Sequence, residues 1–170
     1  MALRQPHQRR SGIGIGMAVL AFALLGSSAH ATEPVLSPNA PRDKPTSLND
    51  TKALERAIAP IVARARASYP EGRQKFLNGL PRGESFFVVT RLRDAGGREE
   101  QVFIAVQRIE GSRITGLIWN QVQRVQGYRY RDVYTFDDKQ LIDWMISKPD
   151  GTEEGNEVGK FLDTYRGPGR

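Results

Sequence analysis

The apolar residues of this 170-residue chain change their spacing at Ser85, from a helical period before it to a period of two after it. The helical stripe before Ser85 consists of Leu54, Ala57, Ile58, Ile61, Val62 and Ala65. After Ser85, apolar and polar residues alternate, as in strands with one buried face. A chain divided in this way predicts an α+β fold, in which N-terminal helices cover one face of a curved antiparallel sheet.

Two prolines interrupt the helical part. Pro60 lies inside the apolar stripe and lacks an N–H, so we expect a kink or a new start there. The Tyr69-Pro70 step predicts the end of this helix, because a residue before proline avoids the helical region. A short second helix is predicted over Glu71–Leu77, with Gly79 as its left-handed C-cap.

Three strands are predicted over Ser85–Arg93, Arg98–Ile109 and Arg113–Asn120. The turns between them are too short for parallel crossovers, so the strands form an antiparallel meander. A fourth strand is predicted over Tyr128–Phe136. Asp137 or Asp138 then caps a short helical turn ahead of Leu141, Ile142, Trp144 and Met145. Pro149-Asp150-Gly151 predicts a turn, and the last short element, Val158–Tyr165, has no clear type.

Residues 1–31 read as a cleavable signal peptide, with a positive start, a short apolar run and small residues before a cut after Ala31. A Sec-type route to the periplasm or the exterior follows, although Arg9-Arg10 leaves twin-arginine export open, and an uncleaved anchor is the alternative. Residues 32–46 are predicted to be a proline-rich linker and residues 47–170 a single α+β domain. After cleavage no membrane anchor is expected.

Both histidines, His7 and His30, lie in the predicted leader, and the chain has no cysteine. The mature protein would therefore lack a Ser-His-Asp triad, a cysteine nucleophile and the usual ligands of zinc. We expect no cofactor, no metal site and no catalytic residue. Removal of the leader takes away three arginines and no acidic residue, so the formal net charge falls from +6 to +3. Such a modest charge gives no reason to expect nucleic-acid binding.

Several short motifs between Ala57 and Gly167 occur in a recognisable order. They are Ala63-Arg64-Ala65-Arg66-Ala67-Ser68-Tyr69-Pro70, Ile114-Thr115-Gly116, Trp119-Asn120, Tyr130-Arg131-Asp132-Val133 and Ile142-Asp143-Trp144-Met145. In this order and spacing the chain resembles the YegJ-like bacterial domain-of-unknown-function family 2314. The resemblance implies a small α+β domain, frequently on exported proteins, and implies no activity or catalytic residue.

Aromatic side chains on the predicted fourth strand suggest a ligand or partner surface. Strict alternation would place Tyr128, Tyr130, Asp132 and Tyr134 on one face, near Trp119. Hydroxyl groups around a carboxylate suit a sugar or peptide, but the same residues also suit cross-strand packing. Asp143 and Trp144 are similarly open to two readings. They form either one wall of a pocket or a core anchor beside a capping carboxylate.

Arg129 and Arg131 would share the opposite face of this strand, with Arg124 nearby. These three arginines form either an anion-binding or partner-binding rim or a solvated sheet face. Paired carboxylates for a glycan hydrolase are not apparent, because Glu99 and Glu100 are adjacent on a strand and point to opposite faces.

These observations favour a monomeric, non-catalytic periplasmic binding or interaction module, whose partner is an envelope protein, a peptide or a cell-wall fragment. The alternatives are an inhibitor or immunity-type protein that docks on an envelope enzyme or toxin, and a carboxylate-based glycan hydrolase.

Overall fold

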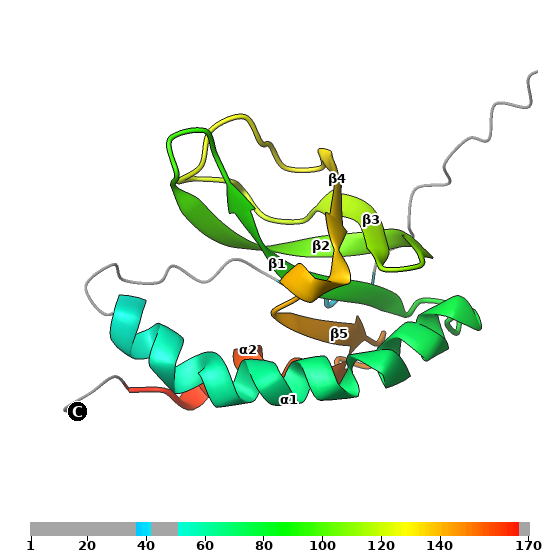
Figure 1. Ribbon diagram of the computed structural model, residues 1–170. Helices are drawn as coiled ribbons and strands as arrows, with labels where there is room; N and C mark the ends of the chain where they lie inside the picture. The colour runs from blue at the N-terminus through cyan, green and yellow to red at the C-terminus, as the bar shows by residue number, and fades with distance from the viewer. Residues whose placement is uncertain (1–36, 42–50, 167–170) are drawn as a thin grey trace, which may run out of the picture. The chain divides into compact units, whose positions relative to one another are not determined.

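A computed structural model describes residues 37–41 and 51–166 of the chain (Figure 1). The predicted leader and most of the predicted linker lie outside these residues. The elements are α1 (Thr51–Leu77), β1 (Ser85–Arg93), β2 (Glu99–Glu110), β3 (Arg113–Ile118), β4 (Val133–Asp137), the 3₁₀ turn η2 (Asp138–Gln140), β5 (Asp143–Ser147), β6 (Glu153–Gly155) and α2 (Glu157–Thr164).

The six strands form one antiparallel sheet in the order β4-β3-β2-β1-β5-β6. The predicted α+β fold and the meander from β1 to β4 are therefore confirmed. The chain then returns to the other side of β1, where β5 pairs with Ser85–Val89. The helices belong to the lower layer in Figure 1, below the curled β1–β4 part of the sheet.

The fourth strand begins at Val133, five residues later than predicted. Residues Arg129–Asp132 form a turn instead, in which the Asp132 N–H donates to the Arg129 carbonyl at 3.1 Å. Arg131 has a φ of 70°, and this left-handed conformation breaks the alternation of a strand. The Asp132 carboxylate also accepts the Arg129 N–H at 2.8 Å, which stabilises the turn.

Strand β5 was not anticipated, because it has no alternation of apolar and polar residues. All five of its residues are buried. It lies between β1 and β6, with both of its faces covered, so the period-of-two signal is absent. The predicted helical turn before it is confirmed as η2, whose N-cap Asp137 accepts the Lys139 N–H at 3.0 Å.

The two predicted N-terminal helices are one helix of 27 residues, so the expected helix end at Tyr69-Pro70 is wrong, and no new helix starts at Pro60. Both prolines are exposed, and the ribbon of α1 curves along its length (Figure 1). A helix that curves around a core accommodates the lost hydrogen bonds on its outer side. Packing of the inner side against the sheet favours continuation of the helix. Gly79, with a φ of 88°, follows its end as predicted.

The main core lies between the curled sheet and the second half of α1. Trp144 packs there against Gly72 and Phe86, and its indole N–H donates to the Ser68 hydroxyl at 3.0 Å. The rest of this core consists of Tyr69, Val88, Leu92, Val102, Ile104, Val106, Ile109, Ile114, Ile118, Val125, Phe136, Leu141 and Ile146. A second cluster joins the first half of α1 to α2 through Ile58, Ile61, Ile142 and Val158.

The opposite face of the sheet is partly covered by residues 37–41. Ala40 packs against a cluster that contains Phe87 and Met145. The Ser37 N–H donates to the Ser85 hydroxyl at 2.7 Å, and the Ser147 hydroxyl donates to the Asn39 carbonyl at 3.1 Å. This part of the predicted linker is therefore attached to the domain by hydrogen bonds to β1 and β5.

Candidate functional site

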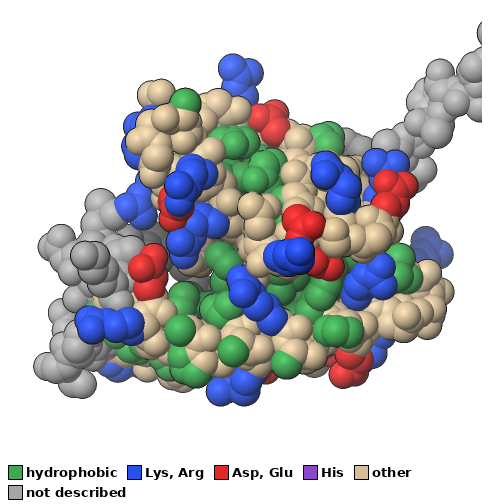
Figure 2. Space-filling model, viewed as in Figure 1, with side chains coloured by type: hydrophobic (Ala, Val, Ile, Leu, Met, Phe, Trp, Pro, Cys, Tyr) green, Lys and Arg blue, Asp and Glu red, His purple; other side chains and the backbone are tan. Residues whose placement is uncertain are grey.

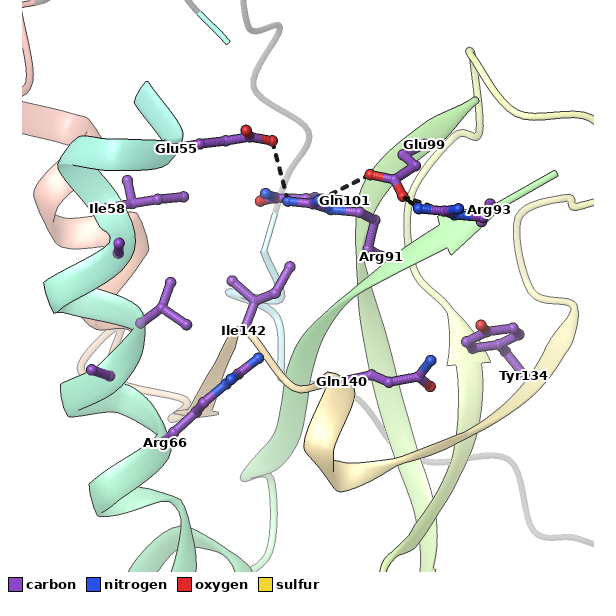
Figure 3. A pocket seen from close by; sticks show the side chains of 13 residues that line it. Glu55, Ile58, Arg66, Arg91, Arg93, Glu99, Gln101, Tyr134, Gln140 and Ile142 are labelled. Atoms are coloured by element: carbon purple, nitrogen blue, oxygen red, sulfur yellow. Dashed lines mark hydrogen bonds and ion pairs between the residues drawn. The ribbon is translucent and has the colours of Figure 1, made fainter. Parts of the chain in front are cut away.

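A groove lies between the first half of α1 and the ends of β1 and β2 (Figures 2 and 3). Its volume is about 730 Å³, within the range typical of ligand sites. We call it the helix–sheet groove and define it by its lining residues. These are Glu55, Ile58, Ala59, Val62, Ala63, Arg66, Arg91, Arg93, Glu99, Gln101, Tyr134, Gln140 and Ile142.

The two walls of the groove differ in chemistry. The α1 wall carries the apolar side chains of Ile58, Ala59, Val62 and Ala63, because these residues continue the apolar stripe of the helix. The sheet wall is polar and carries arginine, glutamate and glutamine. Figure 3 shows Arg91 reaching across from β1 toward α1. The groove therefore presents apolar helix side chains, flanked by Glu55 and Arg66 of α1, opposite charged and amide groups.

The groove opens where β5 leaves β1. The last pair in this ladder is Val89 with Asp143, and the Ile142 N–H donates to the Val89 carbonyl at 2.8 Å. The residues just before β5 form η2 and no longer pair with β1. The Thr90 hydroxyl contacts this turn by donating a hydrogen bond to the Gln140 carbonyl at 3.1 Å. The end of β1 that contains Arg91 and Arg93 is therefore paired with β2 alone.

Arginines dominate the electrostatics of the groove. Arg91 contacts Glu99 at 2.9 Å and Glu55 at 3.6 Å, and the Arg93 Nε donates to Glu99 at 2.8 Å. Hydrogen bonds from Arg93, followed by the charge of Arg91, hold the pKa of Glu99 below its usual value. Arg66 donates from Nε to the Leu141 carbonyl at 2.7 Å, so its orientation is fixed without neutralising its charge. Three arginines against two glutamates leave the lining with a formal charge of +1.

Tyr134 adds a neutral polar group. Burial, followed by the effect of Tyr128, raises the pKa of its phenol, which stays protonated at neutral pH. Beside the amides of Gln101 and Gln140 it gives the groove donors and acceptors around the arginines. This set suits recognition of a carboxylate-bearing ligand by charge-assisted hydrogen bonds.

The groove holds two carboxyl groups, those of Glu55 and Glu99, and both contact Arg91. For glycoside hydrolysis one carboxyl must stay protonated to act as the acid, whereas the pKa of Glu99 is lowered. The carboxyl whose pKa is raised by burial is Asp143, which is 1 % exposed and lies outside the groove lining.

Asp143 and Trp144 both lie in the core of the protein. The Asp143 carboxylate accepts the Trp144 N–H at 2.8 Å and the Val158 N–H at 2.7 Å, so it caps the start of α2. Trp144 is 4 % exposed on the other side of β5. The structure thus places these residues as the predicted core anchor and cap, and their burial leaves them no accessible surface for a ligand.

The residues of the predicted aromatic surface do not share one face. Tyr128 contacts Tyr134, at a ring separation of 5.9 Å, and its hydroxyl donates to the Arg93 carbonyl. Tyr130 instead contacts Trp119, at 5.2 Å, and Trp119 contacts Phe87 of the opposite cluster. The Asp132 carboxylate accepts the Arg129 N–H within the Arg129–Asp132 turn. The prediction of a single aromatic surface is therefore wrong. It assumed that the fourth strand begins at Tyr128, whereas β4 begins at Val133.

The predicted rim residues Arg124, Arg129 and Arg131 are all exposed on the loop of residues 121–132. Glu100 organises the loop, since its carboxylate accepts the N–H groups of Gln123, Arg124 and Val125 at 3.1, 2.7 and 3.3 Å. Glu99 and Glu100 do act separately, as predicted, one in the groove and one under the loop. Whether the exposed arginines form a binding rim remains a prediction.

Sequence reasoning missed Arg66, Arg91 and Arg93 as lining residues, and it assigned Tyr134 to the aromatic face of the fourth strand. The available signal was the alternation of Arg91 and Arg93 on the first strand, which puts two guanidinium groups on one face. Nothing local in the sequence indicated that α1 and η2 would face them.

Comparison with protein-family models, with curated proteins and with solved structures found no match to this chain. The resemblance to the YegJ-like family stays a prediction. Within residues 37–41 and 51–166, no helix is both long and apolar enough to span a bilayer. The same residues contain no group of three or more acidic side chains placed to hold a metal ion.

Proposed function

We propose that this protein is a non-catalytic binding module of the bacterial periplasm or exterior, and that the helix–sheet groove binds a carboxylate-bearing ligand. The observation that carries the proposal is the groove itself, in which Arg91 and Arg93 of the sheet lie opposite a helix wall that combines apolar side chains with Arg66. The ligand classes that suit it are a peptide or a cell-wall fragment, because both combine carboxylates with apolar groups.

The residue types in the groove support a binding role. Among the described residues its lining contains no histidine, cysteine or serine, and the lowered pKa of Glu99 disfavours proton donation. The leader-like pattern of residues 1–31 supports export. Mass spectrometry of the natural product should find Thr32 as the first residue.

The proposal is tested by NMR titration of the purified protein with three carboxylate probes: free glutamate, a soluble muropeptide and the pentapeptide amide acetyl-Val-Glu-Val-Glu-Val. We expect at least one probe to shift the amides of the groove residues. Arg91→Gln combined with Arg93→Gln should weaken its binding by about tenfold or more, since charge-assisted bonds are lost. Added salt should weaken binding to the unaltered protein.

Arg108→Gln combined with Arg113→Gln is the matched control, because it removes two exposed arginines outside the groove. It should leave binding unchanged. If no probe shifts the amides of the groove residues, or if both double variants lose the same affinity, the groove does not recognise carboxylates.

A further inference from the structure

The end of β1 is an open sheet edge inside the groove. The Val89 carbonyl points toward the β5 side, since it accepts the Ile142 N–H. Main-chain groups of alternate strand residues point to the same side. Arg91 and Arg93 therefore direct their N–H and C=O groups away from β2 and toward the groove.

Other contacts agree with this orientation. The Asp94 N–H donates to the Arg98 carbonyl across the β1–β2 turn, so Asp94 faces β2 and its neighbour Arg93 faces away. The Arg93 carbonyl accepts the Tyr128 hydroxyl at 3.0 Å. Three main-chain groups remain without a partner strand among the described residues: the N–H and C=O of Arg91 and the N–H of Arg93.

We infer that the groove binds an extended acidic peptide that adds a strand to the sheet, paired with β1 at Arg91 and Arg93. This inference rests on the proposed function and names its ligand. Main-chain hydrogen bonds to an open edge give such complexes their affinity, and pockets for alternate side chains give them specificity.

Charge determines which peptide suits this edge. The Arg91 and Arg93 side chains lie on one face of the sheet, and residues of an added strand that lie beside them share that face. Acidic residues at alternate positions of the peptide would therefore meet both guanidinium groups. Ile58 and Val62 of α1 pack with Val89, which shares the face of Arg91, so these acidic residues would also lie beside an apolar helix surface.

The ion pairs already present in the groove do not block this arrangement. Glu99 pairs with Arg91 and Arg93 from β2, the strand on the far side of β1 from the open edge. The Glu55 contact with Arg91 is long, at 3.6 Å, and both side chains are partly exposed, so a peptide carboxylate competes with it at little cost.

The test uses the unaltered protein and acetyl-Val-Glu-Val-Glu-Val amide, together with five copies of this peptide that each carry one N-methylated residue. N-methylation removes a donor and leaves every charge in place. If the peptide pairs as a strand, methylation at alternate positions should weaken binding by about tenfold, and methylation between them should have little effect. The lysine analogue acetyl-Val-Lys-Val-Lys-Val amide should not bind.

Amide hydrogen exchange gives an independent readout. Binding should slow exchange at Arg91 and Arg93, whose N–H groups face the groove. The N–H groups of Thr90 and Leu92, which face β2, should change little.

The outcomes separate this inference from the proposed function. A muropeptide or glutamate that binds the groove while the peptide does not would overturn the strand and keep the carboxylate site. If methylation weakens binding equally at every position, or at none, the added strand is also overturned while the carboxylate site is kept. Pairing between two copies of this chain would appear as a dimer without peptide, and would also overturn the inference.

Discussion

Arg131 is held in a conformation that arginine rarely adopts. Its φ of 70° lies in the left-handed region, at the third position of the Arg129–Asp132 turn. An L-residue there is strained by about 1–2 kcal/mol, because its Cβ approaches the backbone, whereas glycine is not.

We predict that Arg131→Gly is more stable than Arg131→Ala by about 1 kcal/mol in chemical denaturation, although alanine usually stabilises a chain relative to glycine. The two variants lose the same side chain, so their difference reports the backbone alone. The pair Arg129→Gly and Arg129→Ala is the control, because Arg129 does not have a positive φ. There the alanine variant should be the more stable one. If the alanine variant is the more stable one at both positions, Arg131 is not strained.

At the scale of elements, helix α1 and strand β5 meet through Gly72 and Trp144. A Cβ built on Gly72 would lie 2.4 Å from the indole Cε3. The indole has little room to move, since its N–H donates to Ser68 and it lies beside Phe86. Glycine here costs helix stability but permits the close approach of the helix to the tryptophan.

Gly72→Ala should therefore destabilise the protein by about 1–2 kcal/mol, because overpacking outweighs a gain of about 1 kcal/mol in helix propensity. Urea denaturation measures the change. Ala67→Gly, at an exposed position of the same helix, calibrates the propensity gain. In a Trp144→Leu background, Gly72→Ala should be neutral or stabilising. An equal loss in both backgrounds would show that the indole is not the cause.

The elements differ in how far local sequence determines them. Strands β1 and β2 follow the predicted ranges closely, because Thr90–Arg93 and Gln101–Ile104 alternate between buried and more exposed residues. Strand β5 is buried on both faces and carries no such signal. The continuity of α1 through Pro60 and Pro70 depends on packing against the sheet, which no local rule contains. The groove was missed for a related reason, since α1, β1 and η2 meet only in the folded chain.

At the scale of the whole molecule, the sheet is covered unequally. Residues 37–41 and the Trp119–Tyr130 pair cover part of one face, and α1 covers the core of the other. The early departure of β5 from β1 leaves the helix–sheet groove between these covered regions. The proposed binding site is therefore a consequence of topology, because a longer β5 ladder would close the open edge.

Acidic groups across the whole molecule determine how stability depends on pH. Local hydrogen bonds and positive charges lower the pKa values of Asp94, Glu99, Asp137, Asp150 and Glu154. At acidic pH the unfolded chain binds more protons at these sites than the folded protein does. Their contribution to stability therefore grows as the pH rises. Asp143 acts in the opposite direction, because burial raises its pKa and the folded protein holds its proton longer.

The five lowered groups outnumber Asp143, so we predict that Tm rises between about pH 3 and pH 5. Residues 37–41 and 51–166 contain no histidine, so little change is expected from about pH 6 to pH 8.

Asp143→Asn should lower Tm, because an amide cannot accept both the Trp144 and Val158 N–H groups through its two side-chain atoms. The difference in Tm between the unaltered protein and the variant should shrink as the pH rises. Asp143 stabilises the unaltered protein less at higher pH, because its pKa is raised in the folded state, and the variant lacks this carboxyl group. Calorimetric scans of both proteins measure this, and a deficit that grows with pH would contradict the raised pKa of Asp143.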